Sequence, residues 1–549
     1  MLLFIFIPFM VKAQYPTKYW IHFTDKNNNA YSISNPSAFL SARALQRRTN
    51  QNIPVITEDL PVTQAYVDSI LTHGASVINR SKWFNSVTIQ TTDTNILNSI
   101  LALPFVQGST AVGRLHSPLR AEEKSFFAHE DYTQAGPTQP VQPQNLSYGL
   151  SYNQIAMCGG DQMHNLGYQG QGMVIAVLDA GFLNADTLHA FDSLRANNQI
   201  LGTWDFVAND ASVYEDYQHG MMVLSTMGGN LPGELVGTAP KASYWLLRTE
   251  EAATEYLIEE ANWASGAEFA DSVGADLINT SLGYTEFDDA TQNHTYSSMD
   301  GNTTIITQAA DKASAKGILV VCSAGNEGAH QWNFIGAPAD ADSVLTVGAV
   351  DSARNYAPFS SNGPSFDGRV KPDVADEGWN ALFASTAGGT QYGSGTSFAS
   401  PIMCGMAACL WQANPSMTAQ QIRNAIIQSA DQYSNPDTLL GYGIPNFMIA
   451  NLVLSGKPLS DFTGENLMKV FPNPFNDQLW FDFYSDSSQI LNYELFDGVG
   501  RSMTIGSVNV GNHSYIRENI PTKYNLAKGT YYLRVVAKNR VFVRSLVKI

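Results

Sequence analysis

The sequence predicts an α/β protein: a doubly wound parallel sheet, with a small α+β unit before it and an all-β sandwich after it. Between residues 151 and 455, short and mostly apolar runs alternate with segments of helix length, as in sheets covered on both faces. The last part of the chain instead alternates apolar and polar residues between Gly, Asn and Asp turns, which is typical of a sandwich. Strand-like and helix-like pieces are mixed before residue 115, which predicts the small α+β unit.

These patterns assign each element in chain order. In the first unit, KYWIHFT and NSVTIQT are expected to be strands, and PSAFLSARALQRR and PVTQAYVDSILTHG to be helices. The buried strands of the central sheet are expected at MVIAVLDA, ADLINTSLG, GILVVCSAGN and DSVLTVGAV. The predicted divisions are residues 1–13, a signal peptide; 14–119, the first unit; 120–150, a linker; 151–455, the central domain; 456–465, a second linker; and 466–549, the sandwich.

Composition narrows the class of protein. The chain has 549 residues, of which 15% are charged and 44% hydrophobic, and this balance suits a globular protein of several domains. Its net charge of −18 and its lack of any basic stripe argue against a nucleic-acid partner. The sandwich alone carries more Lys and Arg than Asp and Glu, so the acidic excess lies in the rest of the chain.

The first thirteen residues, MLLFIFIPFMVKA, predict export. A short apolar run ends in Val11-Lys12-Ala13, which fits the small-residue rule of signal peptidase with cleavage before Gln14. A buried strand or a membrane anchor is the alternative, but about ten apolar residues are too few to span a bilayer. No later run is long enough either, so we expect no transmembrane segment in the mature protein.

Four cysteines, none in CxxC spacing, are few for this length. Three of them stand among apolar or small residues, which favours free buried thiols. The alternative is that one disulfide bond forms in an oxidising compartment.

The stretch GSGTSFASP places Ser397 on a Gly-rich turn before a helix-like run. The simpler interpretation is that Ser397 caps that helix. The alternative is a nucleophilic serine, which needs a base, an acid that orients the base, and donors for an oxyanion.

Three polar residues elsewhere supply such groups. Asp179 ends the apolar run MVIAVLDA, His219 begins a small-residue helix-like run, and Asn326 ends GILVVCSAGN. Taken singly, these residues suit a turn, a loop and a left-handed turn position, respectively. Together with Ser397 they all stand at a strand end or a helix start, where one edge of a parallel sheet could gather them.

With these motifs in order, residues 151 to 455 resemble a subtilisin-like serine peptidase. The matching stretches are VIAVLDAGF, HG, VGTAPKASYWLLR, ADLINTSLG, VVCSAGNEG, VLTVGAV, FSSNGP, KPDV and GTSFASP. Two positions depart from the family pattern: Met221 stands where Thr is usual, and VADEG replaces a neutral stretch. Neither departure removes a catalytic group.

The resemblance implies a secreted serine endopeptidase and a role for each candidate residue. Ser397 would be the nucleophile, His219 the base, Asp179 its orienting partner, and Asn326 a donor of the oxyanion hole. The segments Ser281, Leu282, Gly283 and Ser323, Ala324, Gly325 would line the primary specificity pocket and pair with the substrate backbone. The alternative for both segments is ordinary sheet core.

The flanking units carry their own resemblances. By position and size the first unit resembles the inhibitory propeptides of such peptidases. Through VFPNPFND, LFDGVGR, GTYYLRV and VRSLVKI, the last resembles the sorting domain of the type IX secretion system of Bacteroidota. The expected partners are therefore protein or peptide substrates and the type IX machinery, at the cell surface or outside the cell.

Two further expectations concern cofactors and activity. No cofactor is expected to be required; structural calcium is frequent in the family, but no carboxylate loop of a calcium-binding kind is evident. The alternative to an active enzyme is a catalytically silent binding protein on a peptidase fold, although such a protein would not need all four catalytic groups.

Overall fold

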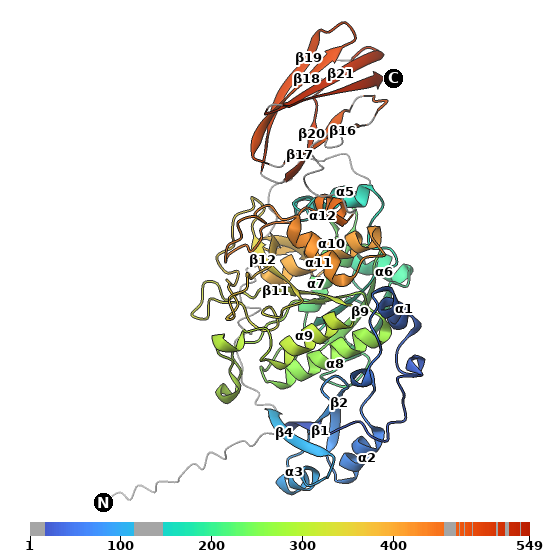
Figure 1. Cartoon of the computed structure of the whole chain (residues 1–549), viewed down its shortest axis with the longest axis vertical. Coiled ribbons are helices and arrows are strands. Elements are labelled where there is room, and N and C mark those ends of the chain that lie inside the picture. The colour runs from blue at the N-terminus through green and yellow to red at the C-terminus, as the bar shows by residue number, and fades with distance from the viewer. Residues whose placement is uncertain are drawn as a thin grey trace, which may run out of the picture.

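A computed structural model gives the fold of the chain (Figure 1). It describes residues 17–114, 146–454, 468–471, 473–476, 478–485, 487–511, 514–521, 526–538 and 540–549. The predicted signal peptide and almost all of both predicted linkers lie outside the described residues.

The first unit is a four-stranded antiparallel sheet in the order β2-β3-β1-β4, with helices packed against it. This confirms the predicted α+β unit, except that the expected helix over PSAFLSARALQRR begins only after Ser41, whose side chain caps it. The elements are β1 (Lys18–Phe23), α1 (Ala42–Asn50), α2 (Gln64–Thr72), β2 (Ser76–Ser81), β3 (Ser86–Gln90), α3 (Thr94–Leu101) and β4 (Val106–Gly113).

The central unit contains a seven-stranded sheet in the order β13-β12-β11-β10-β5-β9-β6, and every pair of neighbours is parallel. Its sheet strands are β5 (Val174–Asp179), β6 (Ile200–Asp205), β9 (Ser243–Arg248), β10 (Leu277–Thr280), β11 (Leu319–Ser323), β12 (Leu345–Val350) and β13 (Val374–Glu377). The short hairpin strands are β7 (Asn230–Leu231), β8 (Leu235–Val236), β14 (Ala381–Ala384) and β15 (Thr390–Gly393). The four strands that the apolar runs predicted all lie in this sheet.

Helices cover both faces of this sheet, as the continuous apolar runs require. Ile175 and Val177 of β5 pack into a core shared with α7 and α10, whereas Val174, Ala176 and Leu178 face a second core with α8 and α9. The helices are α4 (Tyr152–Ala156), α5 (Gly160–Asn165), α6 (Asp192–Ala196), α7 (His219–Gly228), α8 (Ile258–Val273), α9 (Ile305–Ala315), α10 (Thr396–Ala413), α11 (Ala419–Gln428) and α12 (Phe447–Leu454).

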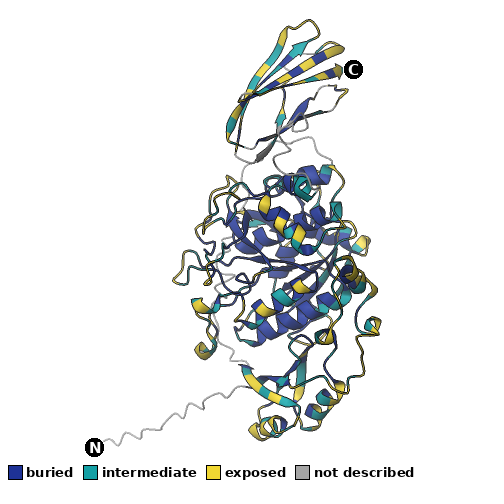
Figure 2. Ribbon diagram, viewed as in Figure 1, coloured by how far each residue is buried: buried dark blue, intermediate teal, exposed yellow. Residues whose placement is uncertain are grey.

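The last unit is a β-sandwich, as predicted. A three-stranded sheet (β16-β17-β20) and a four-stranded sheet (β19-β18-β21-β22) enclose one apolar core. Buried and exposed residues alternate along its longer strands, which Figure 2 shows as alternating colours. The strands are β16 (Met468–Phe471), β17 (Trp480–Ser485), β18 (Gln489–Asp497), β19 (Ser502–Val510), β20 (Ser514–Asn519), β21 (Gly529–Ala537) and β22 (Arg540–Lys548).

The first unit docks on α8 through buried charges. Asp271 of α8 lies within 2.6 Å of Arg47, 2.9 Å of Arg48 and 3.0 Å of Lys82, measured between carboxylate oxygens and side-chain nitrogens. Burial raises the pKa of Asp271, but the three cations outweigh it and hold that pKa well below its usual range. One carboxylate of the central domain thus binds three cations of the first unit.

Glu268, one turn earlier on α8, binds the turn between β2 and β3. Its carboxylate accepts hydrogen bonds from the Ser81 hydroxyl (2.5 Å) and from the backbone N–H groups of Lys82 (2.6 Å) and Trp83 (3.0 Å). Burial, opposed by Lys82 and these donors, raises the pKa of Glu268 to about 7. The docked surface of α8 is therefore acidic.

Replacing Asp271 with Asn should lower the free energy of unfolding of the full chain by about 3–5 kcal/mol, because Arg47 and Lys82 would stay buried without their counter-charge. Urea unfolding followed by intrinsic tryptophan fluorescence, to which Trp20 and Trp83 contribute, measures this loss. The control Glu234→Gln changes an exposed carboxylate and should leave stability within about 0.5 kcal/mol. Equal stability of Asp271→Asn and the wild type would contradict the importance of this network.

Candidate active site

Asp179 and His219 form a buried hydrogen-bonded pair. Asp179 is the last residue of β5 and His219 the first of α7, and His219 Nδ1 lies 2.7 Å from Asp179 Oδ1. Both residues are fully buried, and the same oxygen accepts the backbone N–H of Ala180 at 2.8 Å. Burial raises the pKa of Asp179, while the imidazole opposes that shift by favouring the carboxylate.

Gly220 makes this close approach possible. A Cβ atom at residue 220 would lie 2.5 Å from the carbonyl oxygen of Gly181 and 2.8 Å from Cβ of Asp179. Any larger residue would push α7 away from β5, and His219 with it.

Ser397 lies in the first turn of α10. The helix starts at Thr396 with Gly395 as its N-cap, so the interpretation of Ser397 as the capping residue is wrong. Its side chain is buried, and Oγ makes no hydrogen bond within the described part of the chain. The next residue, Phe398, has its ring centroid 6.5 Å from that of His219, which brings the start of α10 beside the start of α7.

Pro401 determines which group donates a hydrogen bond to the backbone carbonyl of Ser397. Proline has no N–H, so the carbonyl of Ser397, four residues earlier, lacks its usual helical donor. The hydroxyl of Ser281 donates to that carbonyl instead, at 2.9 Å. A second bond, from Ser400 Oγ to Asn279 Oδ1 at 3.0 Å, also joins α10 to β10.

Asn326 is oriented by Thr396. Its Oδ1 accepts hydrogen bonds from the backbone N–H and the hydroxyl of Thr396, both at 2.9 Å. The amide nitrogen therefore lies on the other side, where a Cβ at Gly395 would approach it to 3.5 Å. The left-handed backbone conformation considered for Asn326 belongs to Gly325, with φ of +105°.

The two segments expected to bind substrate lie at neighbouring strand ends. Ser281, Leu282 and Gly283 directly follow β10. Ser323 is the last residue of β11, which is paired with β10, and Ala324 and Gly325 follow it. The structure thus brings all ten predicted site residues to the carboxyl edge of one sheet. Of the six residues in the two substrate segments, five are buried in the full chain and Gly283 is partly exposed.

The two departures from the family pattern, Met221 and the VADEG stretch, contribute buried residues rather than catalytic groups. Met221 is fully buried in the core that contains α7 and α10. Asp376 and Glu377, from VADEG, are buried on β13, and burial raises their pKa values to about 8 and about 7. Asn153 of α4 donates a hydrogen bond to Glu377.

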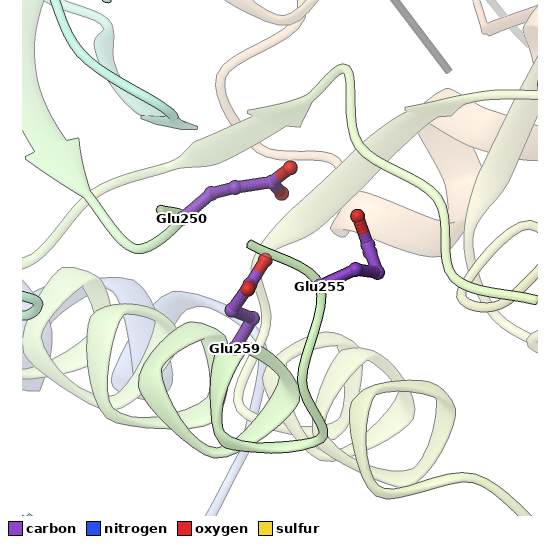
Figure 3. A group of neighbouring side chains, drawn as sticks. All are labelled: Glu250, Glu255 and Glu259. Carbon is purple, nitrogen blue, oxygen red and sulfur yellow. The ribbon is translucent and has the colours of Figure 1, made fainter. Parts of the chain in front are cut away.

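One acidic group near this edge carries no motif in the sequence. Glu250 and Glu255 lie in the loop between β9 and α8, and Glu259 lies in the first turn of α8 (Figure 3). All three are buried, with one carboxylate oxygen of each within 4.8 Å of the others. Among the described residues, this is the group of His, Cys, Asp and Glu side chains that could hold a metal ion. The four cysteines are free and buried.

A buried aspartate paired with histidine, beside a serine in the first turn of a helix and at the carboxyl edge of a parallel sheet, defines an α/β serine hydrolase. The Subtilase family profile matches residues 170–443. Subtilisin DY of Bacillus licheniformis is 32% identical over 292 residues, which cover 52% of this chain and 92% of that protein. Subtilisin E of Bacillus subtilis is 30% identical over 334 residues, which cover 60% and 74%. The chain belongs to the subtilase family.

The flanking units match families of their own. The profile of the Peptidase S8 propeptide domain of Bacteroidota matches residues 18–125, and that of the secretion system C-terminal sorting domain matches residues 469–549. The protein is therefore a serine endopeptidase exported across the outer membrane. No comparison favours the catalytically silent alternative. Among the described residues, no helix combines the length and apolar character that crossing a membrane requires.

Replacing Ser281 with Ala should lower the free energy of unfolding of the central domain by about 1–3 kcal/mol, because the buried carbonyl of Ser397 would lose the donor that substitutes for the missing N–H of Pro401. Calorimetry of the purified protein measures the loss. A Ser281→Ala protein as stable as the wild type would contradict this role of the Ser281 hydroxyl.

Proposed function

We propose that Ser397, His219 and Asp179 carry out peptide hydrolysis as a catalytic triad. Ser397 Oγ attacks the scissile carbonyl carbon while His219 Nε2 takes the hydroxyl proton and then gives it to the leaving amine. Water, deprotonated by the same nitrogen, then releases the acyl group as a carboxylate and restores the serine. The main support for this proposal is the hydrogen bond between Asp179 and His219 Nδ1, because it orients the imidazole so that Nε2 can accept the serine proton.

The oxyanion would be held by two donors, the side-chain amide of Asn326 and the backbone N–H of Ser397. Support comes from the orientation of Asn326, whose oxygen is occupied by Thr396. A donor held in place before the reaction stabilises the developing charge without reorganisation. In this proposal every catalytic group is a side chain or an N–H of the chain itself, so the chemistry requires no cofactor.

The substrate would bind as an extended strand along Ser281–Gly283 and Ser323–Gly325. Backbone pairing of this kind recognises peptide in general, which suits an endopeptidase that acts on proteins. Both segments lie beside Ser397, one through the hydrogen bond from Ser281 and the other through the bond from Gly325 N–H to Thr396 Oγ1 at 3.2 Å.

Ser397→Ala should lower kcat by about 10⁶ and Asp179→Asn by about 10⁴, with folding intact. Each protein is cut in the linker between residues 120 and 150 by an added protease that is then removed, and is assayed on a fluorogenic peptide. A fluorophosphonate probe should label the wild type and leave Ser397→Ala unlabelled. Activity within tenfold of the wild type in either variant would refute the triad.

We further propose that maturation removes residues 1–13 and 14–119, cuts within linker 120–150, and leaves residues 151–455 as the peptidase. N-terminal sequencing of the secreted protein tests these boundaries. The sorting domain, residues 466–549, would contact the type IX machinery rather than the substrate.

Deleting residues 466–549 should leave kcat/KM of the matured enzyme within about twofold, because the proposed site lies entirely in the central domain. In the native host the same deletion should trap the protein behind the outer membrane, as fractionation and immunoblotting would detect. Normal secretion of the truncated protein would overturn the sorting role, and loss of activity without unfolding would indicate that the sandwich binds substrate.

A further inference from the structure

The first unit carries an arm, residues 24–61, that leaves its sheet after β1 and returns before α2. The arm contains α1, which Figure 1 shows apart from the sheet of its own unit and beside the central domain. The ammonium of Lys26 closes the base of the arm, since it donates hydrogen bonds to the carbonyls of Glu58 at 2.7 Å and Leu60 at 2.6 Å. The arm is therefore a folded loop with fixed ends.

The arm docks on the central domain at the amino edge of the parallel sheet. Arg43 donates to the carbonyl of Gly172 at 2.8 Å, two residues before β5, and to that of Gly274 at 2.9 Å, three residues before β10. Gln51 donates to the carbonyl of Gly317 at 2.8 Å, two residues before β11. The triad lies at the opposite edge, and β5, with its six residues, spans about 16 Å. The arm thus binds about one strand length from the triad.

Two helices of the central domain end at this amino edge. Gly274 is the C-cap of α8, and Lys316 is the C-cap of α9. The last carbonyls of a helix have no helical donor and carry the negative end of its dipole. The guanidinium of Arg47 donates to the carbonyl of Lys316 at 3.2 Å and to that of Asp271, in the last turn of α8, at 3.4 Å. One buried cation of the arm therefore satisfies both helix ends.

Gln51, the C-cap of α1, fits the polarity of two helices at once. Its Nε2 donates to the carbonyl of Gly317, after α9, and its Oε1 accepts the backbone N–H of Ala419, the first residue of α11, at 3.0 Å. A Cβ atom at residue 317 would lie 2.7 Å from Nε2 of Gln51 and 2.9 Å from Cδ1 of Ile53. The glycine leaves the space that the arm occupies.

Charges of both signs match across this contact. Besides Arg47 and Arg48, which bind Asp271, the arm carries Glu58, whose Oε1 lies 2.9 Å from Nζ of Lys316. Burial raises the pKa of Glu58, but Lys316 and its neighbour on α9, Lys312, outweigh it and hold that pKa below its usual value. Complementarity of this kind fixes the register of two surfaces and disfavours other partners.

We propose that the arm is a second anchor, which keeps the propeptide bound to the enzyme after the linker is cut. The first anchor is at the other end of α8, where Trp20 and Val112 pack against Ile258. Two contacts joined in one unit raise each other's effective concentration, so loss of either speeds release. The arm therefore governs how long the propeptide stays and leaves the chemistry of the freed enzyme unchanged. The proposal rests on the cut proposed above within residues 120–150.

The test measures how fast the propeptide leaves after that cut. Full-length protein that carries Ser397→Ala, so that nothing released is digested, is cut in the linker by an added protease. After dilution, size-exclusion chromatography at timed intervals measures the freed propeptide. Gln51→Ala should speed release by about 10-fold, because two hydrogen bonds across the contact are lost, and Arg43→Gln by at least about threefold.

The matched control is Gln46→Ala, the same change on the exposed side of α1, where the Gln46 amide donates to Asn50 of the same helix. It should release the propeptide within twofold of the parent rate. Release at the parent rate in both Gln51→Ala and Arg43→Gln would overturn the proposal. Slower refolding from urea with unchanged release would make the arm a folding element alone, which also overturns it.

The same arm variants with Ser397 intact give a second readout. After the cut, the delay before a fluorogenic peptide is hydrolysed should shorten as release quickens, and the final kcat/KM should equal that of the wild type. An altered final kcat/KM would contradict the proposal, because the arm would then act on the site itself. If no protein cuts the peptide while the release rates still differ as expected, the triad is refuted and the second anchor is supported.

Discussion

The site depends on one constraint, the parallel arrangement of the central strands. Because β5, β10 and β11 all run in the same direction, their carboxyl ends meet at one edge, and the helices that return over the sheet begin there. Asp179 ends one of these strands and Asn326 follows another, and His219 and Ser397 lie in the first turns of two of these helices. Residues far apart in the chain are thereby gathered at one edge.

That arrangement brings the groups together, and local hydrogen bonds then hold them. Pro401 removes a helical bond from the carbonyl of Ser397, and Ser281 replaces it, so the start of α10 is tied to β10 rather than only to its own helix. Thr396 fixes the amide of Asn326 in the same way. The first turn of α10 is thus held by hydrogen bonds to residues that follow β10 and β11, and this gives Ser397 the rigidity that transition-state stabilisation requires.

The strands and motifs that depend on a local sequence pattern could be predicted from the sequence. Apolar runs located β5, β10, β11 and β12. The motifs at the ends of two of these runs indicated Asp179 and Asn326, and the motifs before two helix-like runs indicated His219 and Ser397. Two local interpretations fail because a neighbouring glycine takes the special role: Gly395 caps α10 instead of Ser397, and Gly325 takes the left-handed conformation instead of Asn326. Contacts such as Asp271 with Arg47 carry no periodic signal, since they join surfaces that only the folded chain brings together.

Helix α8 shows why these unpredicted contacts matter. Its first turn carries Glu259, one of three buried glutamates with neighbouring carboxylates, and its later turns carry Glu268 and Asp271, which bind the propeptide. The propeptide places Arg47, Arg48 and Lys82 against these later turns and Lys18 near Glu259. Because burying these carboxylates without cations is costly, the acidity of α8 favours a bound propeptide that is basic where it touches the helix. Removal of the propeptide leaves water to solvate the carboxylates of the later turns.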